Sequence, residues 1–151
     1  MKLENGKIIT CNGIIGTAIQ YTDEKDKGIF RFSSIENKPS WMKSKEEFPI
    51  ITKKDTIEDA DDYQKELWLL SECEWLGQPI TAHKIGEYQI VEYKNRETNE
   101  HNFTTFINYK SLSHSYNTLD AAIAGCIAYK YEGCNHAADM YFMKMITRKG
   151  D

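Results

Sequence analysis

The sequence predicts an α+β fold in a single domain that spans residues 1–151. Short segments rich in β-branched residues alternate with polar turns, which is typical of antiparallel strands. Two other stretches combine helix-capping residues with apolar residues at helical spacing. A chain of 151 residues with 40% hydrophobic and 28% charged residues suits one globular domain. We expect antiparallel sheet structure, one central helix, and a C-terminal pair of helices packed on the sheet.

The segment 7–35 predicts a β-meander of three strands. The sequences KIITC and IIGTAIQY flank Asn12-Gly13. This dipeptide favours a type I′ turn, because both central residues of that turn need a positive φ. The sequence IFRFSSI follows a polar turn and completes the predicted meander.

A connector with two prolines leads from the meander to a predicted helix at 55–76. Trp41 either fixes this connector to the body of the protein or acts as an exposed binding anchor. Asp55 or Thr56 is the expected N-cap, and Asp59 lies at capping-box spacing from Thr56. Gly77 is expected to follow the end of this helix.

The segment 80–110 predicts further strands, joined by a polar loop at RETNEH. The strand around residue 106 has apolar residues on both alternating faces, with Phe103, Ile107 and Tyr109 on one and Phe106 on the other. A sheet that is open to water on one side alternates more cleanly. We therefore expect either helices over both faces or a face that meets a partner, for which a homodimer is one arrangement.

Two helices are predicted within 118–146. Thr118 is the expected cap of the first, and Gly133 its stop. Asn135 is the expected cap of the second. The apolar side of the first helix comprises Ile123, Cys126, Ile127 and Tyr131, and that of the second comprises Ala138, Tyr141, Phe142 and Met145.

Cys126, Cys134 and His136 lie close together in the sequence, and this raises the question of a metal site. Structural zinc usually takes four ligands at regular spacing, and here the spacing is irregular and a fourth ligand would be distant. We predict no metal site, and we expect Cys126 to be a buried core residue. Cys134, near a predicted helix start, is the better thiol nucleophile, but no nucleophile motif surrounds it.

The acidic sequence DTIEDADDYQKE has two interpretations. The helix dipole favours carboxylates in a first turn, which explains them structurally. Alternatively, Asp59, Asp62 and Glu66 have helical spacing, share one face, and form a contact surface for a basic partner. Together with Trp41, they are the predicted partner-binding residues.

The sequence SLSHSYNT supports an alternative ligand site. Between a strand and a helix start, backbone N–H groups and the helix dipole favour an anion. The predicted ligand-binding residues of a nucleotide-like anion site are Tyr109, Lys110, Ser113, His114 and Ser115. The same residues also suit an ordinary capped turn, because no phosphate-binding glycine pattern is present.

Charge and hydropathy narrow the classes of partner. The net charge is −4, and arginine occurs only at positions 31, 96 and 148. Both facts argue against general electrostatic binding of nucleic acid. No apolar run approaches the roughly 20 residues that span a bilayer, and the first residues do not resemble a signal peptide. We expect a cytoplasmic protein with reduced thiols and no membrane association.

These observations favour a binding protein over an enzyme. We find no catalytic motif and predict no catalytic residue and no cofactor. We expect a non-catalytic cytosolic protein that binds a macromolecular partner, most simply another protein, as an inhibitor or neutraliser. Phage counter-defence proteins and toxin immunity proteins are examples of this type, by analogy only. The alternatives are a protein that binds or sequesters a small nucleotide-like anion, and an enzyme of unrecognised type.

Overall fold

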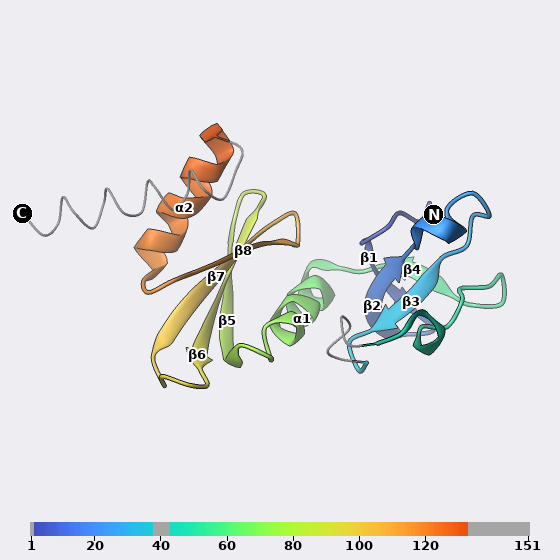
Figure 1. Cartoon of the computed structure of the whole chain (residues 1–151), viewed down its shortest axis with the longest axis horizontal. Helices are drawn as coiled ribbons and strands as arrows, with labels where there is room; N and C mark the ends of the chain where they lie inside the picture. Colours follow the sequence, from blue (N-terminus) through green and yellow to red (C-terminus); the bar gives the residue numbers. More distant parts are fainter. Residues whose placement is uncertain (1, 38–42, 133–151) are drawn as a thin grey trace, which may run out of the picture. The chain divides into compact units, whose positions relative to one another are not determined.

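The fold is α+β, as predicted, in a computed structural model that describes residues 2–37 and 43–132. The chain divides into two compact units, Met1–Glu72 and Cys73–Asp151, which we call the N-terminal and C-terminal units. Within its described residues, each unit contains a four-stranded antiparallel sheet and one α-helix (Figure 1). The prediction of a single domain over 1–151 stays a prediction, because compactness alone does not show that either unit folds without the other.

The sheet of the N-terminal unit has the strand order β3-β2-β1-β4. The predicted meander at 7–35 is confirmed, and Asn12 and Gly13 join its first two strands with φ values of 54° and 84°, as a type I′ turn requires. The short 3-10 helix η1 follows β2, and the short 3-10 helix η3 lies between β3 and β4. The elements are β1 (Ile8–Cys11), β2 (Ile14–Ile19), η1 (Thr22–Glu24), β3 (Arg31–Ser34), η3 (Lys45–Glu47), β4 (Ile57–Asp59) and α1 (Asp62–Glu72).

The two faces of this sheet differ in chemistry. Ala18 and Phe32 are Cα partners on β2 and β3, and they join Ile9 and Cys11 in the hydrophobic core. The next partners along the same strands, Thr17 and Ser33, point to the opposite face because side chains alternate along a strand. That face therefore carries buried hydroxyl groups.

The central helix is shorter than predicted. Residues 57–59 of the predicted helix 55–76 form β4, which pairs with β1 and leaves only Asp62–Glu72 helical. The predicted cap at Asp55 or Thr56 is therefore wrong. Asp61 and Gln64 make the capping box instead: each backbone N–H donates to the other side chain, at 2.9 and 2.8 Å. Pairing with β1 is a tertiary interaction that helix signals in the sequence do not report.

The sheet of the C-terminal unit has the strand order β5-β6-β7-β8, and helix α2 follows it. The strands predicted at 80–110 are confirmed, but strand structure continues to residue 116. Asn108 and Tyr109 form the turn into the last strand, both with positive φ. The elements are β5 (Gly77–Ile85), β6 (Tyr88–Asn95), β7 (His101–Ile107), β8 (Lys110–Tyr116) and α2 (Leu119–Glu132).

Helix α2 packs on one face of this sheet. Ile90, Phe103 and Tyr116 form a cluster there with small residues of the helix, including Ala122 and Cys126. Residues on the other face are buried too: Val91, next to Ile90, has 0% exposure, as does Ile90 itself. The sequence pattern of apolar residues on both faces therefore corresponds to burial of both faces. The homodimer stays a prediction.

The start and core side of α2 agree with the sequence analysis. Thr118 Oγ1 accepts a hydrogen bond from the Ala121 N–H at 3.1 Å, which makes Thr118 the cap. Cys126 is 4% exposed, as expected of a core residue. The second helix of the predicted pair, with its cap Asn135, lies outside the described residues. Within those residues, neither helix has the length and apolar character needed to cross a bilayer.

Candidate functional site

An acidic surface lies where β4 ends and α1 begins. We define it as the exposed residues Asp59, Asp61, Asp62, Tyr63 and Glu66. Tyr63 follows Asp62 in the sequence and stands three residues before Glu66, and 68% of the residue is exposed. Lys65 is the only basic residue between Asp55 and Glu72. The surface thus combines negative charge with one exposed aromatic ring.

Only two of the predicted partner-binding residues lie on the same secondary-structure element. Asp62 and Glu66 lie one turn apart on α1, as predicted. Asp59 lies on β4, so the predicted helical spacing from Asp59 is wrong. Its carboxylate pairs with Lys7 Nζ at 2.9 Å, and this hydrogen bond is the main cause of the lowered pKa of Asp59. Trp41 lies outside the described residues.

Tyr63 was not among the residues predicted from the sequence. It stands three residues before Glu66, and helical spacing places both on one side of α1. Its position in the sequence could have identified it, because it is an aromatic residue in the otherwise polar first turn of the helix. The buried residues of α1, Trp68 and Leu69, lie later in the helix.

The predicted anion site does not have the geometry on which it was based. Tyr109 lies in the β7–β8 turn, and Lys110, Ser113, His114 and Ser115 lie within β8 rather than in a loop before a helix. The Tyr109 N–H donates to Gln89 Oε1 at 2.8 Å. The hydroxyl groups of Ser115 and Tyr93 are hydrogen-bonded at 2.9 Å. Strand pairing aligns these residues with β7, so a helix N-terminus does not gather them around an anion.

The described cysteines are core residues. Cys11, Cys73 and Cys126 are buried free thiols. Burial raises the pKa of Cys73 to about 12 and that of Cys126 to about 11, which keeps both thiols protonated at neutral pH. In residues 2–37 and 43–132, no group of His, Cys, Asp and Glu is arranged to hold a metal ion. Cys134 and His136 lie outside these ranges.

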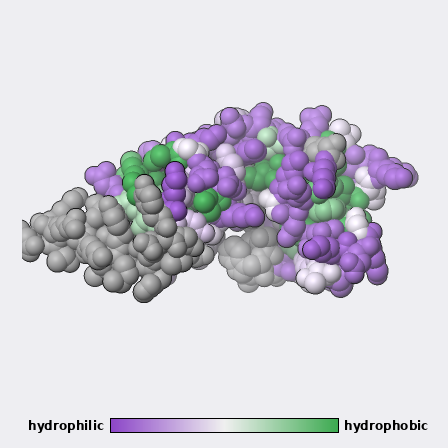
Figure 2. Space-filling model, turned by 90° about the horizontal axis from the view of Figure 1, so that it is seen from above, coloured by the Kyte–Doolittle hydropathy of each residue, from purple (hydrophilic) through white to green (hydrophobic). Residues whose placement is uncertain are grey.

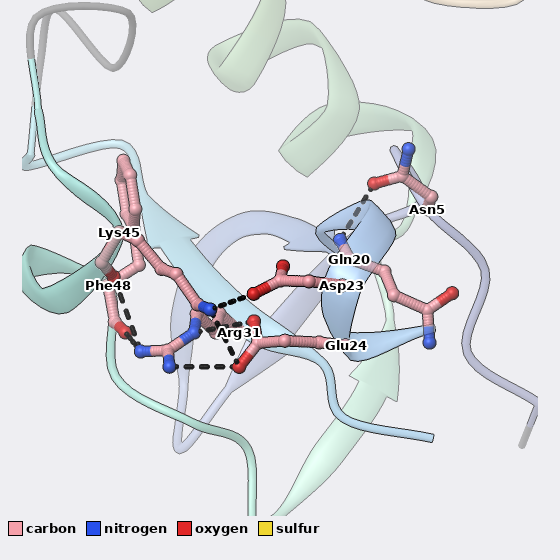
Figure 3. Close-up of polar contacts among 7 residues, drawn as sticks. All are labelled: Asn5, Gln20, Asp23, Glu24, Arg31, Lys45 and Phe48. Atoms are coloured by element: carbon pink, nitrogen blue, oxygen red, sulfur yellow. Dashed lines mark hydrogen bonds and ion pairs between the residues drawn. The ribbon is translucent and has the colours of Figure 1, made fainter. Parts of the chain in front are cut away.

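A charged cluster in the N-terminal unit connects three segments (Figure 3). The Arg31 guanidinium on β3 donates to both carboxylate oxygens of Glu24 in η1, at 2.9 and 3.0 Å. Its Nη1 also donates to the backbone oxygens of Lys45 and Phe48, at 3.2 and 3.0 Å. Lys45 Nζ in turn lies 2.8 Å from Asp23 Oδ2. The cluster fixes η1 and the 45–48 segment against β3.

The charged groups of this cluster stabilise each other's ionised forms. The hydrogen bond from Arg31 lowers the pKa of Glu24, and the hydrogen bond from Lys45 lowers the pKa of Asp23. Both carboxylates are therefore charged at neutral pH and engage the two cations. The sequence offered no signal for this cluster, because its members are brought together only by the folding of β3 and the two short helices.

A polar cavity lies in the same unit. Its volume is about 300 Å³, and it is lined by Asn5, Thr17, Ile19, Gln20, Tyr21, Ser33 and Phe48. Every lining residue within the described part of the chain is uncharged, and most carry hydrogen-bonding groups. Two aromatic rings complete the wall. The sequence does not single out this set, because the residues come from the N-terminal segment, β2 and the two residues after it, β3, and the segment after η3.

The C-terminal unit has a more apolar cavity of about 420 Å³ between α2 and the β5–β6 turn. Its walls include Ile85, Tyr88, Ile123 and Ile127. Ile85 and Ile127 are more than two-fifths exposed. Hydrophilic residues cover much of the described surface that is visible in Figure 2, with smaller hydrophobic areas between them.

The chain was compared with protein families, curated proteins and solved structures, and no match was found in any of the three.

Proposed function

We propose that this chain is a non-catalytic protein that binds a basic protein partner through its acidic surface. The observation that carries this proposal is the exposure of Tyr63 at the start of α1, where Asp61, Asp62 and Glu66 are exposed as well. An isolated acidic helix start is explained by the helix dipole alone. An aromatic side chain that is 68% exposed in its midst has no such structural explanation.

The chemistry of this surface suits recognition of lysine and arginine side chains. Tyrosine is enriched at the energetic centres of protein interfaces, where its ring packs and its hydroxyl group bonds. Carboxylates around such a ring steer a positively charged partner and disfavour an acidic one. The ring also offers a face to a cation, and Arg is the usual partner in such contacts.

The surface is also held in place before binding. The reciprocal Asp61–Gln64 hydrogen bonds fix the start of α1, and the Lys7–Asp59 pair fixes β4. A rigid surface loses less conformational entropy on association than a mobile one. This favours a stoichiometric inhibitor or neutraliser that occupies the basic site of its partner, which is the mode of action that we propose.

The test compares the wild-type chain with Tyr63→Ala, Glu66→Lys and a matched control, Glu97→Lys, which reverses an exposed charge in the C-terminal unit. Each protein is used as bait in the native host, and the captured partner is then titrated by calorimetry. We expect Tyr63→Ala to weaken binding about 30-fold, as loss of a 2 kcal/mol anchor implies. Glu66→Lys should slow association at low salt, and Glu97→Lys should bind like the wild type.

Equal binding by the wild type and Tyr63→Ala, with both proteins folded, would place the contact elsewhere. Catalytic turnover of a substrate by the purified chain would contradict the non-catalytic assignment.

A further inference from the structure

Two buried hydroxyl groups face the polar cavity of the N-terminal unit. Thr17 and Ser33 are Cα partners on β2 and β3, so their side chains lie next to each other on one face of the sheet. Thr17 is 9% exposed and Ser33 is 3% exposed, and both residues line the cavity. Among the described residues, none forms a hydrogen bond with either hydroxyl group. Each hydroxyl can therefore donate to and accept from a molecule in the cavity.

Side-chain amides add a further set of donors and acceptors. Asn5 Oδ1 accepts a hydrogen bond from the Gln20 backbone N–H at 2.9 Å, which fixes the Asn5 side chain at the wall (Figure 3). The amide nitrogen of Asn5 remains a donor, and Gln20 is a second amide-bearing residue of the lining. Paired amide donors and acceptors match the edges of heterocyclic bases, which present the same two kinds of group side by side.

Two aromatic rings border the cavity. Phe48 is buried, and its backbone oxygen is held by Arg31 at 3.0 Å. The ring of Tyr21 has Lys45 Nζ 5.7 Å from its centroid, at cation–π distance. Aromatic side chains with one free face provide stacking surfaces for planar rings, and this contact tolerates any base.

Charge argues against an anionic ligand. The two cations of the adjacent cluster, Arg31 and Lys45, are already held by Glu24 and Asp23 at 2.8 to 3.0 Å. A phosphate in the cavity would have to compete with these carboxylates, and the described residues of the wall would offer it only uncharged groups. A neutral ligand avoids both problems.

From these observations we propose that the polar cavity binds a small, uncharged, planar heteroaromatic molecule, namely a nucleobase or nucleoside. Thr17, Ser33, Asn5 and Gln20 make the hydrogen bonds, and Tyr21 stacks on the ring. A volume of about 300 Å³ lies at the lower end of the range for ligand cavities, which suits one base rather than a dinucleotide. This site is separate from the acidic surface, and its test requires no protein partner.

The experiment titrates the isotopically labelled full chain with adenosine, guanosine, cytidine and uridine, and follows backbone amides by NMR. Glucose and adenosine 5′-monophosphate serve as comparison probes. We expect at least one nucleoside to shift the amides of residues 17, 21 and 33 in a saturable manner and to raise the thermal midpoint. The monophosphate should bind no more tightly than adenosine.

Two variants remove the hydroxyl groups, and two matched controls remove hydroxyl groups nearby. Thr17→Val and Ser33→Ala should each weaken nucleoside binding about fivefold, the loss expected for one neutral hydrogen bond. Neither should lower the thermal midpoint of the ligand-free chain, because no described residue uses these hydroxyls. Thr10→Val changes a buried threonine that does not line the cavity, and Ser34→Ala changes the neighbouring β3 residue; both should bind like the wild type.

Mapping on the wild-type chain keeps the test decisive even where a variant fails to fold. The proposal is overturned if no nucleoside shifts residues 17, 21 and 33 at about 5 mM, several times a weak Kd of about 1 mM. Saturable shifts of these residues by glucose alone, or tighter binding of the monophosphate than of adenosine, would also overturn it. None of these results depends on the acidic surface.

Discussion

Gly125 of α2 lies against the ring of Tyr116, and this contact leaves no room for a side chain. A Cβ atom at position 125 would overlap the Tyr116 hydroxyl oxygen and would lie 2.5 Å from Cζ and 3.1 Å from Cε1. Carbon atoms pack at about 3.5 to 4.0 Å, so either the helix or the ring has to move. Gly125→Ala is therefore expected to disturb the packing of α2 on the sheet.

Two opposing terms set the magnitude. Alanine favours a helix interior over glycine by about 1 kcal/mol. Overpacking of a filled core costs about 1 to 3 kcal/mol. Tyr116 is only 3% exposed and packs with Phe103 and Ala122, so it has little freedom to swing away. We expect the overlap to dominate and Gly125→Ala to lower the free energy of unfolding by about 1 kcal/mol.

The assay is urea denaturation followed by far-ultraviolet circular dichroism, in two backgrounds. With Tyr116→Ala the ring is absent, so Gly125→Ala should now stabilise the protein by about 1 kcal/mol through helix propensity alone. The two effects have opposite signs and define a coupling of about 2 kcal/mol. The reasoning is refuted if Gly125→Ala stabilises the wild-type chain, or if its effect is the same in both backgrounds.

Three further predictions concern stability. Thr118→Ala should lower the free energy of unfolding by about 1 kcal/mol through loss of the α2 cap, whereas Thr118→Ser should retain most of it in the same urea assay. Gly13→Ala should lower the free energy of unfolding by about 1 kcal/mol, because alanine is strained at a φ of 84°. Nothing lies within 4 Å of the added atom, so a larger loss would contradict this reasoning. The raised pKa values of Cys73 (about 12) and Cys126 (about 11) disfavour the thiolates in the folded state. Stability is therefore full below the ordinary pKa of 9.0 and declines from there to about pH 12, and a midpoint in urea that is constant over that range would contradict this.

Local signals predicted the parts of the fold that depend on neighbours in sequence. Asn12-Gly13 predicted its hairpin because few other residue pairs adopt positive φ at both positions. Thr118 predicted the start of α2 because its hydroxyl reaches the N–H three residues on. Asn108-Tyr109 makes a similar turn, but tyrosine rarely adopts positive φ, so the strand after it was missed.

Long-range strand pairing determined the structure of the segments for which local sequence signals were misleading. Residues 57–59 follow an apparent helix cap, yet they pair with β1 and move the helix start to Asp62. The serine-rich segment at 111–115 resembles a turn by composition, but pairing with β7 makes it a strand, so it lacks the helix-start geometry on which the predicted anion site rested. Trp41, Cys134 and His136 lie outside the described residues, and the predictions for them stand as predictions.

The sequence by itself determined the α+β class, the turn at Asn12-Gly13, the cap of α2 and the core position of Cys126, because each follows from backbone preference or apolar spacing within a few residues. Only the tertiary structure decided the polar cavity and the charged cluster beside it. Thr17 and Ser33 meet through strand pairing, and Glu24 and Arg31 meet through the return of the chain from η1 to β3. Such juxtapositions depend on which distant segments pair, and the composition of each segment alone does not specify its partner.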